Sequence, residues 1–292
     1  MSHKEFKTID EQISILQHRG LIISDREEAE RFLFRNNYYR ISGYSLTLRK
    51  HDVFSKDAVF QNVVDIYKFD HELRHILLKY IEEIEVTVKS VYAYEFTKVY
   101  GGTGYLDPNN FTNADRHKNI MEKAEQQMNA RLPHEAYLKH FVEDLKEEIP
   151  LWAYVDLLTI SDISFLYSIS DHPIKTAVSS ELGIHKQGER LLGQFMHSMT
   201  IIRNLCAHGS RLFNRLFEQK PSLNKKEKQL LIVNEDNTID NAHLYGFILI
   251  MRRLLQPASF YAMKDEIIAL CDKYPFVRMS YYGFRADWKE KL

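Results

Sequence analysis

Apolar residues recur at every third or fourth position along most of the chain, which is the spacing of amphipathic α-helices. The longest stripe predicts a helix of about 35 residues that ends at the glycine cluster of residues 101–104. Its apolar positions are Ile66, Phe69, Leu73, Ile76, Tyr80, Ile84, Val88 and Val91. A second stripe predicts a helix that starts near Gly188, with Leu192, Phe195, Met199, Ile202 and Cys206 on its buried face. Because Cys206 continues this stripe, we expect it in the core.

Shorter patterns fill most of the remaining chain. Two capping-box patterns, Thr8-x-x-Glu11 and Ser24-x-x-Glu27, predict two short N-terminal helices. Further helices are expected over residues 114–131, 134–148, 151–168, 243–255 and 259–273. Residues 38–57, with strand-like character at 44–48, predict a connector or small hairpin, and residues 230–239 predict a short hairpin insertion. We therefore expect an all-α bundle with additional N-terminal helices that admits one short β-hairpin.

Domain organisation and composition indicate one ordinary globular unit. No internal repeat or linker divides residues 1–292, so we expect a single domain with an N-terminal part at 1–57 and a helical bundle at 58–292. A hydrophobic content of 45% is enough to bury a full core. Two cysteines are too few for a disulfide scaffold or a Cys-rich metal site, and no segment reads as a secretion signal or membrane span. We expect a cytoplasmic protein with no membrane partner and no cofactor.

The stretch Arg203-Asn204-Leu205-Cys206-Ala207-His208 carries the main candidate chemistry. RNA contains its own nucleophile, the ribose 2′-hydroxyl, so cleavage needs only proton transfer and stabilisation of a charged phosphate. Histidine titrates near neutrality and arginine keeps its charge, which suits these two tasks. Asn204 and His208 are four residues apart and share a helix face, so we expect the amide to orient the imidazole. The other interpretation is that Arg203 and His208 have no catalytic role and only stabilise a helix C-terminus, where the helix dipole favours cations.

A basic segment follows this motif. The whole chain has a net charge of −1 and a pI near 6.9, which gives no general support for nucleic-acid binding. Residues 203–228, however, contain seven Lys or Arg against two Glu. The candidate RNA-binding residues beyond the motif are Arg211, Arg215, Lys220, Lys225, Lys226 and Lys228. A solvated helix face is the alternative explanation of this charge run.

The sequence His71-Glu72-Leu73-Arg74-His75 matches H-E-x-x-H, the helix of zinc peptidases. Two histidines four residues apart can bind one metal ion, and the glutamate can activate water. A charged residue lies between the two histidines, and no third ligand stands out. An exposed, charged helix face explains the pattern as well.

Five short motifs follow one another along the chain. They are Asn37-Tyr38-Tyr39-Arg40 with Gly43-Tyr44; Phe69-Asp70-x-x-Leu73-Arg74 with Ile84-Glu85; Pro150-Leu151-Trp152; Arg203-Asn204-Leu205-Cys206-Ala207-His208 with Arg211-Leu212-Phe213-Asn214; and Gly283-Phe284-x-x-Asp287-Trp288. Their order resembles that of Abi-like abortive-infection proteins (the AbiD/AbiF type), a bacterial branch of the HEPN superfamily. In that pattern Asp70, Leu73 and Arg74 are the expected residues, and the histidines of the H-E-x-x-H match are incidental.

The resemblance implies an all-α HEPN-like fold and the superfamily signature of an arginine and a histidine with four to six residues between them. It therefore implies that Arg203 and His208 are catalytic, with Asn204 as the polar residue after the arginine. It also implies a homodimer, because HEPN nucleases generally build one site from two paired domains.

Residues and resemblance together predict a metal-independent endoribonuclease of bacterial antiviral defence or a toxin-like growth inhibitor. Its expected partners are RNA and a second copy of the chain, and a regulatory small RNA or an antitoxin is a further candidate. The alternative is a non-catalytic RNA-binding or interaction module of the same fold. A zinc metallopeptidase that uses His71, Glu72 and His75 is the third reading.

Overall fold

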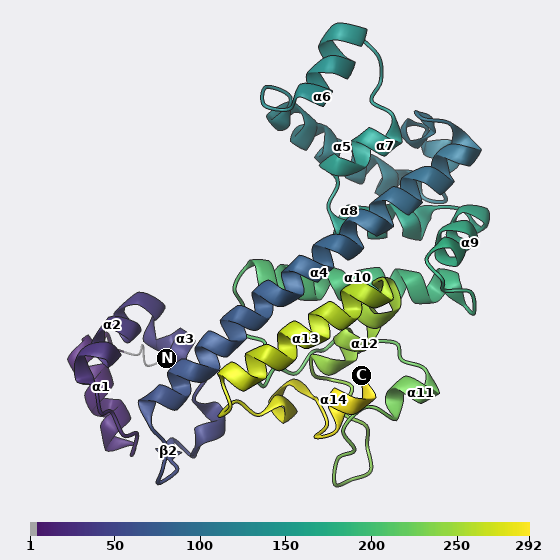
Figure 1. The fold of residues 1–292 in the computed structure, drawn as a ribbon. Coiled ribbons are helices and arrows are strands. Elements are labelled where there is room, and N and C mark those ends of the chain that lie inside the picture. Colours follow the sequence, from purple (N-terminus) through teal and green to yellow (C-terminus); the bar gives the residue numbers. More distant parts are fainter. Residues whose placement is uncertain (1–4) are drawn as a thin grey trace.

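The computed structural model describes residues 5–292, and nearly all of its regular structure is helical (Figure 1). The α-helices are α1 (Ile9–His18), α2 (Arg26–Asn36), α3 (Tyr38–Ser42), α4 (Phe60–Tyr100), α5 (Ala114–Arg131), α6 (Ala136–Lys139), α7 (Leu151–Tyr154), α8 (Ile160–Ile169), α9 (His172–Glu181), α10 (Gly188–Ala207), α11 (Lys225–Lys228), α12 (Tyr245–Leu254), α13 (Pro257–Lys273) and α14 (Trp288–Lys291). Short helical turns are η1 (Leu46–Leu48), η2 (Gly104–Leu106), η3 (Pro108–Asn110), η4 (His140–Leu145), η5 (Val155–Leu157) and η6 (Met279–Tyr282). Strands β1 (Arg49–Lys50) and β2 (Val53–Phe54) form one antiparallel hairpin. These elements confirm the expected all-α fold with a short hairpin.

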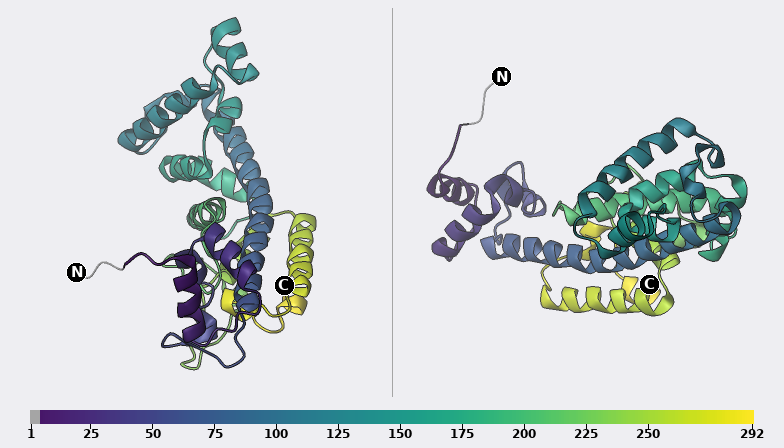
Figure 2. Two further views of the ribbon diagram at one scale, coloured as in Figure 1. Left: turned by 90° about the vertical axis from the view of Figure 1, so that its left-hand side faces the viewer. Right: turned by 90° about the horizontal axis from the view of Figure 1, so that it is seen from above.

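Helix α4 runs through the whole molecule and organises it. It has 41 residues and contains neither proline nor glycine, so it extends for about 60 Å. Its buried residues keep the spacing of three or four that predicted it, from Val63 to Phe96. Figure 2 places α1–α3 at one end of α4, and its left-hand view shows α5 and α6 toward the other end. Among residues 5–292, none of the helices combines the length and apolar composition needed to cross a bilayer.

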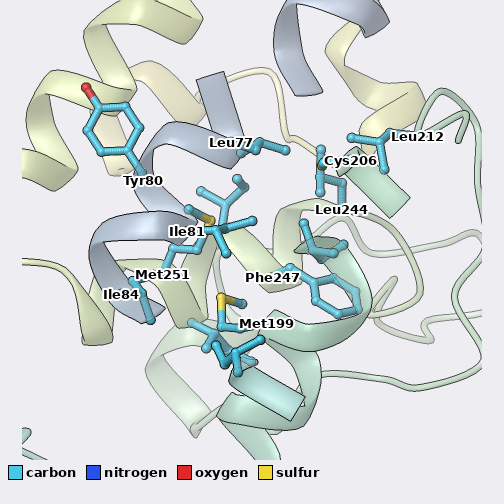
Figure 3. Packing of buried hydrophobic residues seen from close by; sticks show 14 of the residues in the cluster. Leu77, Tyr80, Ile81, Ile84, Met199, Cys206, Leu212, Leu244, Phe247 and Met251 are labelled. Carbon is cyan, nitrogen blue, oxygen red and sulfur yellow. The ribbon is translucent and has the colours of Figure 1, made fainter. Parts of the chain in front are cut away.

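The core forms where α10, α12 and α13 pack on the middle of α4. Leu77 and Ile81 of α4 face Met199 of α10 across this core (Figure 3). Helix α13 runs antiparallel to the first half of α4, since Glu72 pairs with Lys273 and Lys79 pairs with Glu266. This packing places α10 against α4, which matters because α10 carries the candidate motif.

In the N-terminal part, the structure confirms the predicted capping box of α1 and corrects three other predictions. Thr8 and Glu11 form the expected capping box of α1. The Ser24 box is wrong, because the carboxylate of Asp25 accepts from Glu28 N at 2.8 Å and caps α2 instead. Residues 38–42 form the unpredicted helix α3. The strands of the hairpin lie at residues 49–54 and not at 44–48, where Tyr44 is buried and the chain makes the turn η1.

The opposite end of α4 carries shorter helices than the sequence predicts. Helix α5 has the expected bounds. Residues 134–148 form only α6 and the π-helical turn η4, while residues 151–168 are divided into α7, η5 and α8. The break occurs because Leu158 is extended and Thr159 begins a new capping box with Asp162. Helix α9 was not predicted.

The glycine cluster after α4 lets the chain fold back closely. Gly101 ends the helix with a φ of +76°, a conformation that favours glycine. A Cβ on Gly102 would lie 3.1 Å from the ring of Trp152, and Leu151 N donates to Gly102 O at 2.8 Å. The Pro150-Leu151-Trp152 motif therefore closes against this turn.

Near the C-terminus, α12 and α13 lie where they were expected. Residues 230–239 make the expected turn, but they pair only through a single bridge between Val233 and Ile239. Asn237 has a φ of +62° there, which allows the tight turn.

A buried carboxylate on α4 holds the segment that follows α10. Asp70 is fully buried and accepts hydrogen bonds from Leu212 N at 3.2 Å and from Phe213 N at 2.8 Å. The hydroxyls of Tyr44 and Tyr282 also donate to it, at 2.8 and 3.0 Å. Three distant parts of the chain therefore meet at one side chain. We call Asp70, Arg74, Tyr44 and Tyr282 the Asp70 cluster.

Arg74, one helical turn further along α4, supplies the balancing charge. It is only 2% exposed, and its Nη1 donates to Asp70 Oδ2 and to Ser210 O, the latter at 3.4 Å. Burial raises the pKa of Asp70, while Arg74 and the other donors oppose that rise. Because guanidinium and backbone N–H groups can only donate, their convergence on both carboxylate oxygens favours the ionised form.

We predict that Asp70→Asn lowers the free energy of unfolding by at least about 3 kcal/mol, because it leaves Arg74 buried without its counter-charge. Denaturant unfolding of the two proteins measures the difference.

Glu72→Gln is the matched control, since Glu72 lies on the same helix and pairs with Lys273 at the surface. Its cost should not exceed about 1 kcal/mol. Equal losses in the two variants would contradict a special role for Asp70.

Candidate functional site

The motif lies at the C-terminal end of α10, and the apolar stripe of the helix fixes its orientation. Leu192, Phe195, Met199 and Ile202 are fully buried, as the sequence predicts. They pack against α4, α8, α9 and α12. Arg203, Asn204 and His208 lie off this stripe, with Arg203 partly exposed and the other two exposed. Because the apolar stripe is packed against these helices, the three polar side chains point toward solvent.

Arg203 is oriented by α4. Its Nε lies 4.0 Å from the Glu85 carboxylate, and its side chain keeps 38% of its surface exposed. Glu85 also pairs with Lys89 at 2.9 Å, one turn further along α4. Because Lys89 already balances Glu85, the charge of Arg203 is not cancelled by its neighbour. A guanidinium held this way can still bind an anion from solvent.

Asn204 and His208 do not form the contact that their spacing predicted. The Asn204 Oδ1 lies 3.5 Å from Arg203 Nη1, so the amide is turned toward the arginine rather than toward the imidazole. His208 is the residue that ends α10, and its backbone N–H donates to Asn204 O at 3.0 Å. Its side chain is exposed, which leaves the ring available to an incoming ligand.

The main chain directly after His208 is held firmly. Gly209 has a φ of +62° and turns the chain away from the helix. Arg40 Nη2 of α3 donates to Gly209 O, and Arg74 donates to Ser210 O. Asp70 accepts from the backbone N–H groups of Leu212 and Phe213. The exposed side chain of His208 therefore projects from a backbone that these hydrogen bonds hold in place.

Cys206 lies in the core, as expected. It is 4% exposed, and burial raises the pKa of its thiol to about 12. The thiol stays protonated near neutral pH, and a protonated thiol is a poor nucleophile. Nucleophilic catalysis by Cys206 is therefore excluded on physical grounds.

The H-E-x-x-H residues lie on the first half of α4. The rings of His71 and His75 contact each other edge to face, with centroids 4.6 Å apart. Glu72 accepts from Lys273 at 2.8 Å and from Tyr274 at 2.6 Å. Among residues 5–292, no three His, Cys, Asp or Glu side chains are grouped so that they could hold a metal ion. The Glu72 carboxylate thus helps to hold α4 against the end of α13.

The structure separates the six candidate RNA-binding residues beyond the motif into two groups. Arg211 and Arg215 lie in the segment after the motif. Arg211 Nη1 donates to Phe213 O at 2.5 Å, and its guanidinium packs over Gly43, where a Cβ would lie 3.1 Å from its Nε. Arg215 lies over the ring of Phe217 at 5.8 Å. These two cations are close to His208 along the chain and in the fold.

The remaining lysines lie elsewhere. Lys225, Lys226 and Lys228 belong to α11, and Lys228 lines a cavity of about 540 Å³ together with Lys186 and Arg190 at the start of α10. Ser222 donates to Gln194 Oε1 at 2.7 Å, which fixes this segment on the first half of α10. Arg190 and His208 are 18 positions apart, or about 27 Å of helix. Lys220 is exposed in the loop between the two groups. The six residues therefore do not form one strip beside the motif.

From the sequence, we expected no role in the site for the residues that support the motif from other elements, although most of them lie in the motifs of the family resemblance. Glu85 and Lys89 orient Arg203, Arg40 holds Gly209, and the Asp70 cluster holds residues 210–213. One signal was present in the sequence: Asp70 and Arg74 are four residues apart on the apolar stripe of α4, whose only other buried charged residue is Glu95.

Comparison with known proteins relates the chain to a family. The sequence model described as Abi-like protein matches residues 31–214. Four of the five motifs, including Asp70, Arg74 and the residues from Arg203 to Asn214, fall within that range. No curated protein and no solved structure matches the chain. Because the match covers more than half of its length, the chain belongs to the Abi-like protein family, which relates it to abortive infection.

Proposed function

We propose that the protein is a metal-independent endoribonuclease of the HEPN type, and that cleavage of RNA is its part in abortive infection. One observation carries this proposal: Arg203 and His208 are open to solvent on a main chain that buried hydrogen bonds hold in place. Fixed positions for a proton-transfer group and a cation are the requirements of this reaction.

In the proposed reaction the 2′-hydroxyl attacks the adjacent phosphorus. His208 accepts the hydroxyl proton while the new P–O2′ bond forms and the P–O5′ bond breaks. The leaving 5′-oxygen takes a proton from a second imidazolium. Arg203 binds the non-bridging oxygens, on which negative charge accumulates. The products are a 2′,3′-cyclic phosphate and a 5′-hydroxyl.

The second imidazolium comes from His208 of the partner subunit, because each chain has only one arginine and histidine with four residues between them. A single exposed pair is weakened by water, whose high dielectric constant reduces every charge interaction. Two copies related by a two-fold axis would line one groove with two histidines and two arginines. The homodimer is therefore part of the proposed mechanism, and Arg211 and Arg215 of each chain would flank that groove.

We predict that His208→Ala and Arg203→Ala each lower the rate of RNA cleavage by at least about 100-fold, since each removes a group that acts in the transition state. Both side chains are at the surface, so thermal unfolding should change little, by about 0.5 kcal/mol or less. A large stability loss in His208→Ala would instead indicate a purely structural role. Cleavage is measured by gel analysis of total bacterial RNA.

His71→Ala is the matched control, because His71 is another exposed histidine on a helix. It should cleave RNA at the wild-type rate, also in EDTA, and the products should carry cyclic phosphates. Loss of cleavage in EDTA, or products with 3′-hydroxyls, would reject the mechanism. One zinc per chain that is lost in His71→Ala would favour a metallopeptidase, and binding without cleavage would favour an RNA-binding module.

We also predict that the active species has twice the 34.6 kDa mass of one chain. Light scattering at the concentrations of the cleavage assay gives that mass, and specific activity should fall on dilution as the dimer dissociates. A monomer with full activity would contradict the composite site.

A further inference from the structure

A large cleft lies beside the motif. It has a volume of about 1040 Å³ and is bounded on one side by α1, α2 and α3 and on the other by residues 209–211. Figure 1 shows these three helices gathered beside the start of α4. The residue directly before this wall is His208, so the cleft opens next to the proposed reaction site. No part of the proposed mechanism uses it.

The cleft contains two arginines whose charges are not balanced locally. Lys7 pairs with Glu5, and Asp52 pairs with both Arg19 and Arg49. Arg40 and Arg211 have no carboxylate within ion-pair distance among residues 5–292, and both donate instead to backbone carbonyls. Each guanidinium has five N–H donors, so several donors of each remain for a ligand. Two unneutralised guanidiniums in one cleft favour an anion with several oxygens, such as a phosphodiester.

Exposed aromatic rings line the same cleft. Tyr39 of α3 is 77% exposed and Phe34 of α2 is 80% exposed. Tyr39 directly precedes Arg40, so a ring and a guanidinium project from adjacent residues of one short helix. Water-exposed rings beside cations are the usual features of proteins that stack unpaired bases while they bind the backbone.

We propose that this cleft binds single-stranded RNA next to the phosphate that is cut, with bases stacked on Tyr39 and Phe34 and the backbone phosphate on Arg40 and Arg211. The proposal rests on the proposed ribonuclease function, because that function supplies the RNA. We do not expect a duplex to bind in this way, since its bases are already stacked on one another and cannot stack on Tyr39 and Phe34. Arg40 has a double role here, because the side chain that would hold the RNA also holds Gly209 beside His208.

The test measures binding separately from cleavage. All variants are made in the full-length His208→Ala chain, and fluorescence anisotropy records binding of a labelled single-stranded RNA of about 12 nucleotides. Tyr39→Ala and Phe34→Ala should each weaken binding by about tenfold, and Arg211→Gln should weaken it and reduce its salt dependence. The same sequence as an RNA duplex should bind more weakly than the single strand.

Two control variants match these changes. Tyr261 is a half-exposed tyrosine on α13, and Arg116 is an exposed arginine on α5. Tyr261→Ala and Arg116→Gln should bind the single strand as the parent does. In a second readout, RNA that contains 4-thiouridine is crosslinked to the parent chain, and the crosslinked peptides should include residues 34–40.

The possible results separate the two proposals. Wild-type binding by Tyr39→Ala and Phe34→Ala, or crosslinks that all lie outside the cleft, would overturn the RNA subsite. Equal binding of duplex and single strand would do so as well. Cleavage by His208→Ala at the wild-type rate would reject the proposed nuclease alone, because the binding results do not depend on His208.

Discussion

The carboxylate of Asp70 makes the contacts on which the rest of the site depends. It is a buried charge, and a buried charge is tolerated only when it is paired and fully hydrogen-bonded. Arg74, two tyrosine hydroxyls and two backbone N–H groups meet that requirement together. Each of these donors is thereby fixed in space, and two of them belong to the turn that follows the motif. The need to satisfy one charge thus determines where α10 ends relative to α4.

The helices that the sequence predicts well are those in which one local signal agrees with another. The apolar stripe of α10 and its start at Gly188 are both set by residues close together in the sequence. The same holds for α5, which has the expected bounds. The division between α7 and α8 was missed because periodicity continues across it. The capping pair of Thr159 and Asp162 outweighs that periodicity. Helix α9 begins at His172, with Asp171 as its N-cap and a proline in its first turn, a pattern too short to stand out from the adjoining apolar segment.

The candidate site likewise has parts that local sequence predicts and parts that it does not. Spacing alone places Arg203 and His208 at one helix end, because their relation is set within two turns of helix. Their supports could not be found by spacing, because Arg40, Glu85 and Tyr282 come from three different elements. For the basic segment, the sequence predicted a proximity to the motif that the fold does not have. Its lysines are near the motif in sequence, but the chain turns back along α10 after Arg215 and carries them to the other end of the helix.

The contribution of Tyr282 has a consequence for the order in which the protein becomes competent during synthesis. The ribosome makes the motif by residue 208, yet the hydroxyl that completes the Asp70 cluster belongs to Tyr282, 74 residues further along the chain. A nascent chain that already contains Arg203 and His208 therefore lacks one donor to the buried charge until Tyr282 has been made. The turn after the motif is held in full only from that point on. A chain whose translation stops between residues 208 and 282 carries every reactive side chain of the motif without the complete framework that positions it.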